Sequence, residues 1–379
     1  MLLSIIAVIV VLSPIVIIHE FGHFIACRLT GIGVKEFSFG FGKILWHKKS
    51  SKGTDFQIRA IPFGGFVEPE GQMFQEDDAK EAPKPSEFAA KKWYAKFFMV
   101  VNGALFNYIL AAVIFAGLIY IKGMPETDPT LLPAQVGSVA KGYPAEKINL
   151  QERDFITSIN GQPIANWQEL TQAIQARQGD LALTVKRGEE TLDMTVKGSD
   201  FLADKPTVLG ITVYPQMKAV GFWKSAGLGV YQCWYWTKFS LNSLWQSISH
   251  KKAPDVAGPI GIVNIIHQSV HRGWLDFIFL IAMLSLAVGM FNLFPIPILD
   301  GGYALVYLWE GLTGKLPSTK NIMRAANVGF YILMLLVVYA SYADIKRIFF
   351  KPQTAAVAVQ TAGEAEQAQP QEPAAQEGN

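Results

Sequence analysis

The stretch 15-IVIIHEFGHFIAC-27 decides how the rest of the chain is interpreted, because His19, Glu20 and His23 interrupt a long apolar run. That run occupies residues 1–28 and is long enough to cross a bilayer as a helix, which takes roughly 20 apolar residues. A charged side chain at the centre of such a helix costs on the order of 2.5–3.5 kcal/mol. Three ionisable side chains within five residues of such a helix therefore need a shared function that offsets this cost.

The spacing of these residues is that of a metal site. Helix positions four apart lie on one face, so the imidazoles of His19 and His23 can reach a single ion. Zinc accepts neutral imidazole nitrogen, and Glu20 can take a proton from water that zinc activates. H-E-x-x-H on its own recurs by chance on soluble helices, and only the apolar surroundings give it weight here. A catalytic zinc also needs a third protein ligand, which must lie elsewhere.

The candidate third ligand is Asp300, in 292-NLFPIPILDGG-302 at the end of another apolar run. The two prolines interrupt helical hydrogen bonding, so we expect Asp300 on irregular backbone at membrane depth. Such backbone is tolerated only where it is buried in protein or lines a wet cavity. A carboxylate there, facing His19 and His23, completes a site for one zinc ion per chain.

Composition places the whole chain among membrane proteins. Of its 379 residues 50% are hydrophobic and 17% are charged, against about 25% charged in soluble domains. The net charge of +2, without a basic cluster interleaved with aromatic residues, argues against a nucleic-acid partner. Cys27 and Cys233 have no C-x-x-C spacing, which argues against a disulfide framework or a thiolate metal site.

The expected fold class is a polytopic α-helical membrane protein with about four transmembrane helices. These helices lie within residues 1–28, 97–121, 274–302 and 325–350. The second contains Asn102 and Asn107. A signal peptide is the alternative for the first, but no basic residue precedes Arg28.

Charge also predicts the orientation. Residues 29–96 are rich in Lys and Arg, which favours the cytoplasmic side and puts the long segment after the second span outside. Four spans put the C-terminus outside as well, although Lys346 and Arg347 argue mildly against that. The tail 353–379, made of Ala, Gln, Glu and Pro, is expected to be disordered.

Residues 132–214 are predicted to form an inserted α/β domain. Short β-type runs, a turn at Asn160 and a helical pattern after Trp167 occur in the order strand, strand, helix, strand, strand. The stretch 137-GSVAKGYPAEKINLQERDFITSINGQPI-164 resembles bacterial PDZ domains, and Gly210 with Ile211 resembles their carboxylate-binding loop in circularly permuted form. The alternative is a small α/β domain without a peptide groove.

HEFGH and NLFPIPILDGG together resemble the site-2 protease family, whose pattern joins H-E-x-x-H to N-x-x-P-x-P-x-L-D-G-G. The PDZ-like segment is similar to the bacterial, regulator of sigma E protease branch. Further similarities are 101-VNGALFNYILA-111, which departs from the family's Ala-Gly-Pro start, and 257-AGPIGI-262. The resemblance covers residues 1–350 and leaves out the tail.

The resemblance implies specific roles for residues. His19, His23 and Asp300 would bind zinc, Glu20 would be the general base, and Asn292 would hold substrate or orient the scissile peptide. The alternative for Asn292 is a hydrogen bond between helices.

The resemblance further implies an intramembrane zinc endopeptidase. It would cut transmembrane segments of single-span substrates, such as an anti-sigma factor or a remnant signal peptide, after a first cut on the outer side. The protein would lie in the bacterial inner membrane, with the active site near the cytoplasmic face and the PDZ-like domain outside.

Two further segments are expected to meet the membrane. Residues 29–96 contain alternating strands that resemble the family's membrane-associated β-hairpin, whose edge can pair with an extended substrate. The alternative is a cytosolic hairpin docked on the helices. Residues 215–272 are predicted to form an interfacial amphipathic segment rich in Trp and Tyr.

Other function classes remain open at this stage. A metal-dependent lipid hydrolase does not need the two peptide-handling segments, and a metal transporter does not need Glu20 beside its ligand. An inactive scaffold does not need the complete set of four catalytic residues. The sequence leaves open the substrate, the oligomeric state, and whether the PDZ-like domain binds C-termini or excludes bulky substrates.

Overall fold

The computed structural model describes residues 2–71, 83–201, 207–250 and 257–350. The chain divides into two compact units, one built from residues 1–119 and 222–379 and the other from residues 120–221. The predicted tail, 353–379, lies outside the described residues.

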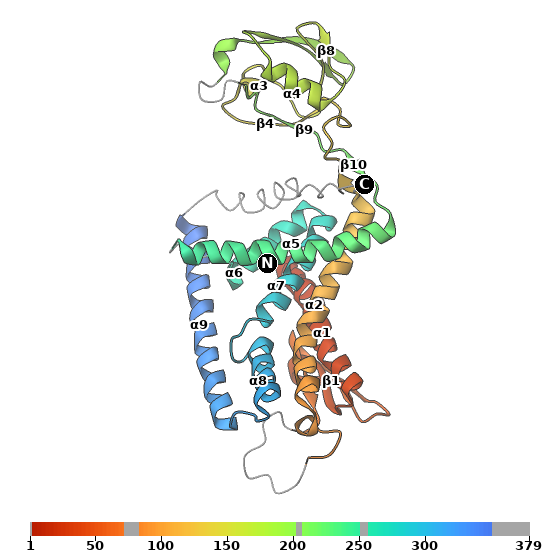
Figure 1. The fold of residues 1–379 in the computed structure, drawn as a ribbon, viewed down its shortest axis with the longest axis vertical. Coiled ribbons are helices and arrows are strands. Elements are labelled where there is room, and N and C mark those ends of the chain that lie inside the picture. Colours follow the sequence, from red (N-terminus) through yellow and green to blue (C-terminus); the bar gives the residue numbers. More distant parts are fainter. Residues whose placement is uncertain (1, 72–82, 202–206, 251–256, 351–379) are drawn as a thin grey trace, which may run out of the picture. The chain divides into compact units, whose positions relative to one another are not determined.

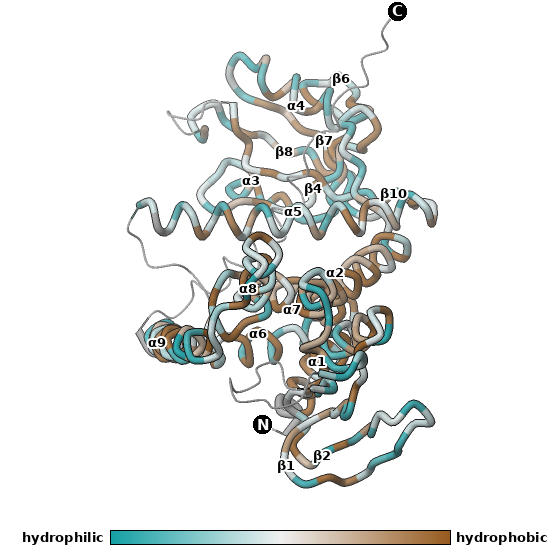
Figure 2. Tube along the Cα trace, turned by 60° about the horizontal axis from the view of Figure 1, so that its bottom comes forward, coloured by the Kyte–Doolittle hydropathy of each residue, from teal (hydrophilic) through white to brown (hydrophobic). Residues whose placement is uncertain are grey.

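Four helices of the first unit are long and apolar enough to cross a membrane, as predicted (Figure 1). They are α1 (Leu2–Thr30), α2 (Trp93–Lys122), α7 (Trp274–Asn292) and α9 (Thr319–Phe350). The second and fourth begin four and six residues earlier than the apolar runs at 97 and 325 indicate. The added residues are 93-WYAK-96 in α2 and 319-TKNIMR-324 in α9. Figure 2 shows the hydrophobic residues along these helices.

The third apolar segment, predicted over 274–302, is two helices. The first, α7, ends at Asn292, and α8 (Asp300–Thr313) begins after a short irregular loop that contains both prolines. The expectation that Asp300 itself sits on irregular backbone is therefore wrong, because Asp300 is the first residue of α8. A carboxylate is favoured there, since the N-terminal end of a helix carries partial positive charge.

Two glycines let the loop fold back against the start of α8. A Cβ on Gly301 would lie 2.4 Å from the backbone oxygen of Leu293, and one on Gly302 would lie 2.4 Å from that of Ile296. Ile298 in the same loop has a φ of 89°, which is unusual for a β-branched residue. The loop therefore has a defined, strained conformation directly before Asp300.

The strands predicted within residues 29–96 form an antiparallel hairpin of β1 (Val34–Lys49) and β2 (Asp55–Pro69). The ladder is not a simple one, because residues 36–39 of β1 pair with residues 65–68 and also with residues 55–58 of β2, and residues 55–58 pair in turn with residues 46–49 of β1. Its base is attached to α1 by aromatic contacts, in which the rings of Phe37 and Phe56 lie 5.5 and 5.6 Å from that of Phe24. The hairpin therefore starts beside the part of α1 that carries the H-E-x-x-H pattern.

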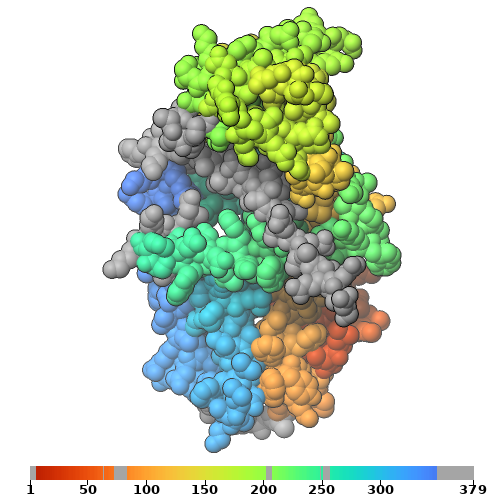
Figure 3. Space-filling model, turned by 45° about the horizontal axis from the view of Figure 1, so that its top comes forward, coloured from red at the N-terminus to blue at the C-terminus, as the bar shows by residue number. Residues whose placement is uncertain are grey.

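The segment 215–272, predicted as an interfacial amphipathic segment, contains two helices, and Pro259 is the first residue of the second. These are α5 (Phe222–Ser249) and α6 (Pro259–Arg272). Figures 1 and 3 show α5 as a band that crosses the spanning helices. Trp223, Trp234 and Trp245 on α5 are exposed, as an interfacial helix requires. The amide N–H groups of Gly258 and Gly261 at the start of α6 donate to the buried Asp344 carboxylate of α9 at 3.2 and 2.7 Å.

The second unit is a small α/β domain with its own hydrophobic core. Its four-stranded antiparallel sheet has the order β6-β5-β7-β8, and β4 pairs with β9 in a separate two-stranded sheet. The strands are β4 (Val136–Val139), β5 (Phe155–Ile159), β6 (Gln162–Pro163), β7 (Leu181–Arg187), β8 (Glu190–Val196) and β9 (Ile211–Val213). Two helices, α3 (Pro144–Lys147) and α4 (Trp167–Gln175), complete it, and β3 (Met124–Pro125) pairs with β10 (Met217–Lys218) where the chain enters and leaves.

A buried ion pair supports this core. Arg187 donates to both carboxylate oxygens of Asp154 at 2.8 Å. Burial alone raises the pKa of Asp154, but the hydrogen bonds from Arg187 and from the Gln151 backbone lower it below its usual value. The pair ties β7 to the turn that precedes β5.

Candidate metal centre

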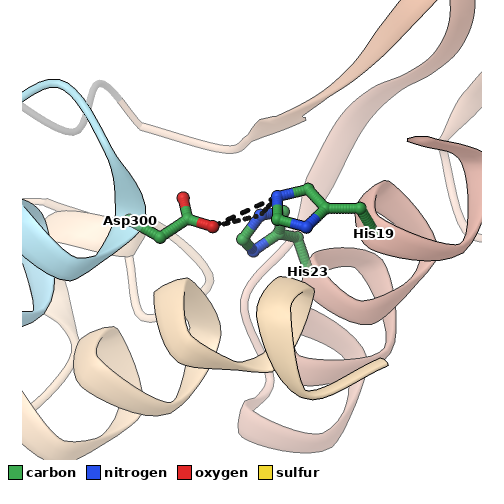
Figure 4. Close-up of side chains that lie close together, drawn as sticks. All are labelled: His19, His23 and Asp300. Atoms are coloured by element: carbon green, nitrogen blue, oxygen red, sulfur yellow. Dashed lines mark hydrogen bonds and ion pairs between the residues drawn. The ribbon is translucent and has the colours of Figure 1, made fainter. Parts of the chain in front are cut away.

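Three ligand atoms from two helices converge in the first unit. His19 and His23 lie one turn apart on α1 and point toward Asp300 on α8 (Figure 4). The Nε2 atoms of the two histidines are 3.2 Å apart, and they lie 3.1 and 3.5 Å from Oδ2 of Asp300. The structure therefore brings together three residues predicted as ligands, two of them 277 and 281 positions from the third in sequence.

The size of this triangle suits zinc. Ligand atoms about 2.0–2.1 Å from a tetrahedral ion lie roughly 3.3 Å from one another. The three separations, 3.1, 3.2 and 3.5 Å, bracket that value. Three protein ligands leave the fourth position for water or substrate, which is the arrangement of catalytic zinc sites.

The Asp300 oxygen gives independent support for a cation. Oδ2 is buried and, apart from the two Nε2 atoms at 3.1 and 3.5 Å, has no hydrogen-bond partner among the described residues. A buried carboxylate oxygen without a donor is costly unless a positive charge compensates it. Zinc held by Asp300 and the two Nε2 atoms would remove that cost, so the residues present fit the ion.

Helix α2 also contacts the imidazoles and orients them. Nδ1 of His23 donates to the backbone oxygen of Met99 at 2.8 Å, which leaves its Nε2 with a lone pair for metal. The side-chain amide of Asn102 donates to the Gly22 oxygen at 2.6 Å and joins α2 to α1 within the H-E-x-x-H pattern. A Cβ on Gly103 would lie 2.4 Å from His23 Nε2, so only glycine leaves room for the ring.

Glu20 lies next to the cluster of His19, His23 and Asp300 but is not part of it. Its carboxylate is half-buried against β2, where it accepts a hydrogen bond from the Val67 backbone, and a Cβ on Gly65 would be 3.2 Å from its Cγ. This position suits a base that acts next to the metal.

The remaining predicted residues lie elsewhere. Asn292 is the last residue of α7 and is half-buried. Gly210 and Ile211 belong to the second unit. Gly210 has a φ of 84°, and a Cβ there would lie 2.1 Å from that of Tyr143, so the loop before β9 requires glycine.

The sequence interpretation missed three residues of α2 that surround the imidazoles: Met99, Gly103 and Asn107. Met99 acts through its backbone, which no side-chain pattern reveals. Asn107 had a visible signal, because an amide inside an apolar span needs a partner. Its side chain lies 3.3 Å from Nδ1 of His19.

The chain matches known proteins over nearly its whole length. The model of peptidase family M50 matches residues 7–336. A protein of Rickettsia conorii that carries a zinc metalloprotease name is 32% identical, covering 92% of this chain and 100% of its own. The zinc metalloprotease RasP of Oceanobacillus iheyensis is 26% identical, covering 91% of this chain and 99% of its own.

The family model and these relatives agree with the geometry on the two points that matter. The family model and the names of the relatives indicate a zinc-dependent peptidase, and the chain itself has four candidate membrane spans. The chain therefore belongs to peptidase family M50, the site-2 protease family, and is a zinc metalloprotease.

Proposed function

We propose that this protein hydrolyses peptide bonds inside the membrane, in the transmembrane segments of single-span proteins. The observation that carries the proposal is the position of the ligand cluster. His19 and His23 lie within the candidate span Ile6–Thr30, and Asp300 reaches them from α8. A peptidase whose ligands lie within a spanning helix takes its substrate from the bilayer.

In this proposal His19, His23 and Asp300 would hold one zinc ion, and that ion would supply the positive charge that polarises the scissile carbonyl and activates water. Glu20 accepts the proton of the attacking water and passes it to the departing amide nitrogen. The contact of Glu20 with Val67 on β2 holds the carboxylate beside the ligands. Asn292, at the end of α7, binds the substrate backbone near the cut.

The hairpin β1–β2 presents the substrate. Among the described residues, residues 46–49 of β1 and residues 65–68 of β2 pair on one side only, so each of these two segments leaves one edge free. A transmembrane helix must unwind before its peptide bonds can be reached, and an edge strand stabilises the unwound form through main-chain hydrogen bonds. Because β2 lies against Glu20, a segment paired with it lies close to the base.

The second unit acts as a PDZ-like domain in this proposal. Among the described residues β9 pairs only with β4, which leaves one edge for a peptide, and Gly210 and Ile211 lie where this edge begins. The domain either binds a C-terminus exposed by an earlier outer cut or excludes substrates with bulky outer domains. Anti-sigma factors and remnant signal peptides are the substrate classes that fit.

The proposed location is the bacterial inner membrane. The basic residues of 29–96 put the hairpin and the zinc near the cytoplasmic face, and residues 132–214 lie outside. The relatives from Rickettsia conorii and Oceanobacillus iheyensis are bacterial, which supports a bacterial membrane as the location.

The variant Glu20→Gln tests this proposal, because it keeps the size and hydrogen bonding of the side chain but removes the base. General base catalysis contributes about 10²–10⁴-fold, so cleavage should fall by that factor while zinc is retained. A membrane protein already trimmed on its outer side should co-purify with the variant. Near wild-type cleavage would refute the role of Glu20, and loss of zinc would make Glu20 a ligand.

A further inference from the structure

Asn107 is fully buried in the middle of an apolar span. Its exposed fraction is 0%, and its side-chain nitrogen lies 3.3 Å from Nδ1 of His19. The other end of the amide, Oδ1, is buried and has no hydrogen-bond partner among the described residues. A polar group in this environment is costly, so its retention needs a reason.

The histidine decides which end of the amide faces it. His19 can present Nε2 to a metal only if its proton sits on Nδ1. That buried N–H then needs an acceptor, and the Asn107 side chain is the group that lies there. A carboxamide turned by 180° keeps its shape and exchanges its nitrogen for its oxygen, so Oδ1 can take this place.

We propose that Asn107 is a positioning residue for zinc, which accepts a hydrogen bond from Nδ1–H of His19 through Oδ1. This contact fixes both the tautomer and the ring orientation that direct Nε2 at the ion. The inference rests on the proposed ligand set and extends it to α2. Helix α2 then supplies both acceptors, the Met99 carbonyl for His23 and the Asn107 amide for His19.

The surrounding helices hold Asn107 in place. The hydroxyl of Ser285 on α7 donates to the Asn107 backbone oxygen at 2.9 Å. Gly289, one turn further along α7, packs so closely that a Cβ there would lie 3.2 Å from that of Asn107. Both contacts come from one face of α7, which therefore packs closely against Asn107.

The decisive variants are Asn107→Asp and Asn107→Leu, measured as full-length protein in detergent by zinc competition with a chelator. Leucine is similar in size but accepts no hydrogen bond, so zinc affinity should fall about 10–100-fold. Aspartate can only accept, so Asn107→Asp should hold zinc at least as tightly as the wild type. If Asn107 instead donates to His19, Asn107→Asp loses zinc as Asn107→Leu does, and the proposal is overturned.

Tyr108→Phe is the matched control, because it removes the 3.1 Å hydrogen bond between the Tyr108 and Thr237 hydroxyls, next to Asn107 on α2, without touching the imidazole. It should lower the unfolding temperature and leave zinc affinity unchanged. The absorption spectrum of the cobalt-loaded protein should change in Asn107→Leu and stay as in the wild type in Tyr108→Phe. Equal zinc affinities in these two variants would also overturn the proposal.

The failure of this inference can be told apart from the failure of the proposed function. Zinc affinity that is the same in Asn107→Leu and in its control would overturn the inference alone and leave the ligand set intact. Zinc binding that survives His19→Ala and His23→Ala together would instead refute the proposed function.

Discussion

At the scale of single residues, the four candidate site residues could be identified from the sequence because each is unusual for its surroundings. His19, Glu20 and His23 are ionisable groups in an apolar helix, and Asp300 follows two prolines at the end of another. Asn107 broke the same expectation, but its partner could not be predicted without the crossing of α1 and α2. Met99 could not be predicted at all, because every residue has a backbone carbonyl.

The ligand assignment makes a direct prediction about metal content. The purified protein should contain about one zinc per chain. His19→Ala and His23→Ala should each lose it, since the two remaining ligands do not complete a catalytic site. Asp300→Asn should weaken binding, because the neutral amide cannot replace the charge of the carboxylate. The measurement is elemental analysis after dialysis, and full retention by the double histidine variant would rule out this site.

At the scale of elements, the sequence predicted the spanning helices and the hairpin but not α6 or the position of Asp300 in α8. Pro259 at the start of α6 was a start signal that the aromatic pattern of the segment obscured. Gly301 and Gly302 are weak helix formers, so the start of α8 could not be read from propensity. The close contact of Gly301 and Gly302 with the preceding loop determines where α8 begins.

Close packing of α2 on α1 predicts a difference between two glycines of the same helix. Gly103→Ala should lose zinc, because the new Cβ would lie 2.4 Å from His23 Nε2. Gly117 has no neighbour within 4 Å of such a Cβ. Gly117→Ala should therefore stabilise the helix by up to about 1 kcal/mol and keep zinc. Zinc content and thermal unfolding in detergent measure both effects, and zinc retained by Gly103→Ala would contradict the packing described.

The buried pair of Lys96 on α2 and Glu310 on α8 gives a second prediction at this scale. Lys96 Nζ lies 2.9 and 3.2 Å from the two carboxylate oxygens, and the lysine side chain is 3% exposed. Lys96→Met leaves a buried charge unpaired and should destabilise by about 3–5 kcal/mol. Adding Glu310→Met should recover most of that loss, which unfolding titrations of the single and double variants measure. Additive losses would mean that the two residues do not interact.

At the scale of the whole molecule, charge and length account for the arrangement of spans, and the family match covers residues 7–336. The division into two units was visible in the sequence as a change from apolar runs to short alternating strands. The second unit covers residues 120–221 rather than the predicted 132–214, because it includes the pair of strands β3 and β10 at its two ends. That pair has two residues in each strand, too few for a pattern to reveal.

The proposed orientation predicts the result of reporter fusions. A reporter inserted at the turn between β1 and β2 should report the cytoplasm, because residues 29–96 carry the basic side chains that remain inside. A reporter at the turn between β7 and β8 should report the outside. The opposite result at both sites would reverse the membrane topology and move the zinc to the other face.

The most direct measurement of the central claim is the position of the cut. Purified protein is incubated with a single-span substrate whose outer domain has been removed, and the new termini are mapped by mass spectrometry. We predict a zinc-dependent cut within the transmembrane segment that is lost in Glu20→Gln. A cut that lies only outside the membrane segment, or that persists in Glu20→Gln, would contradict the account.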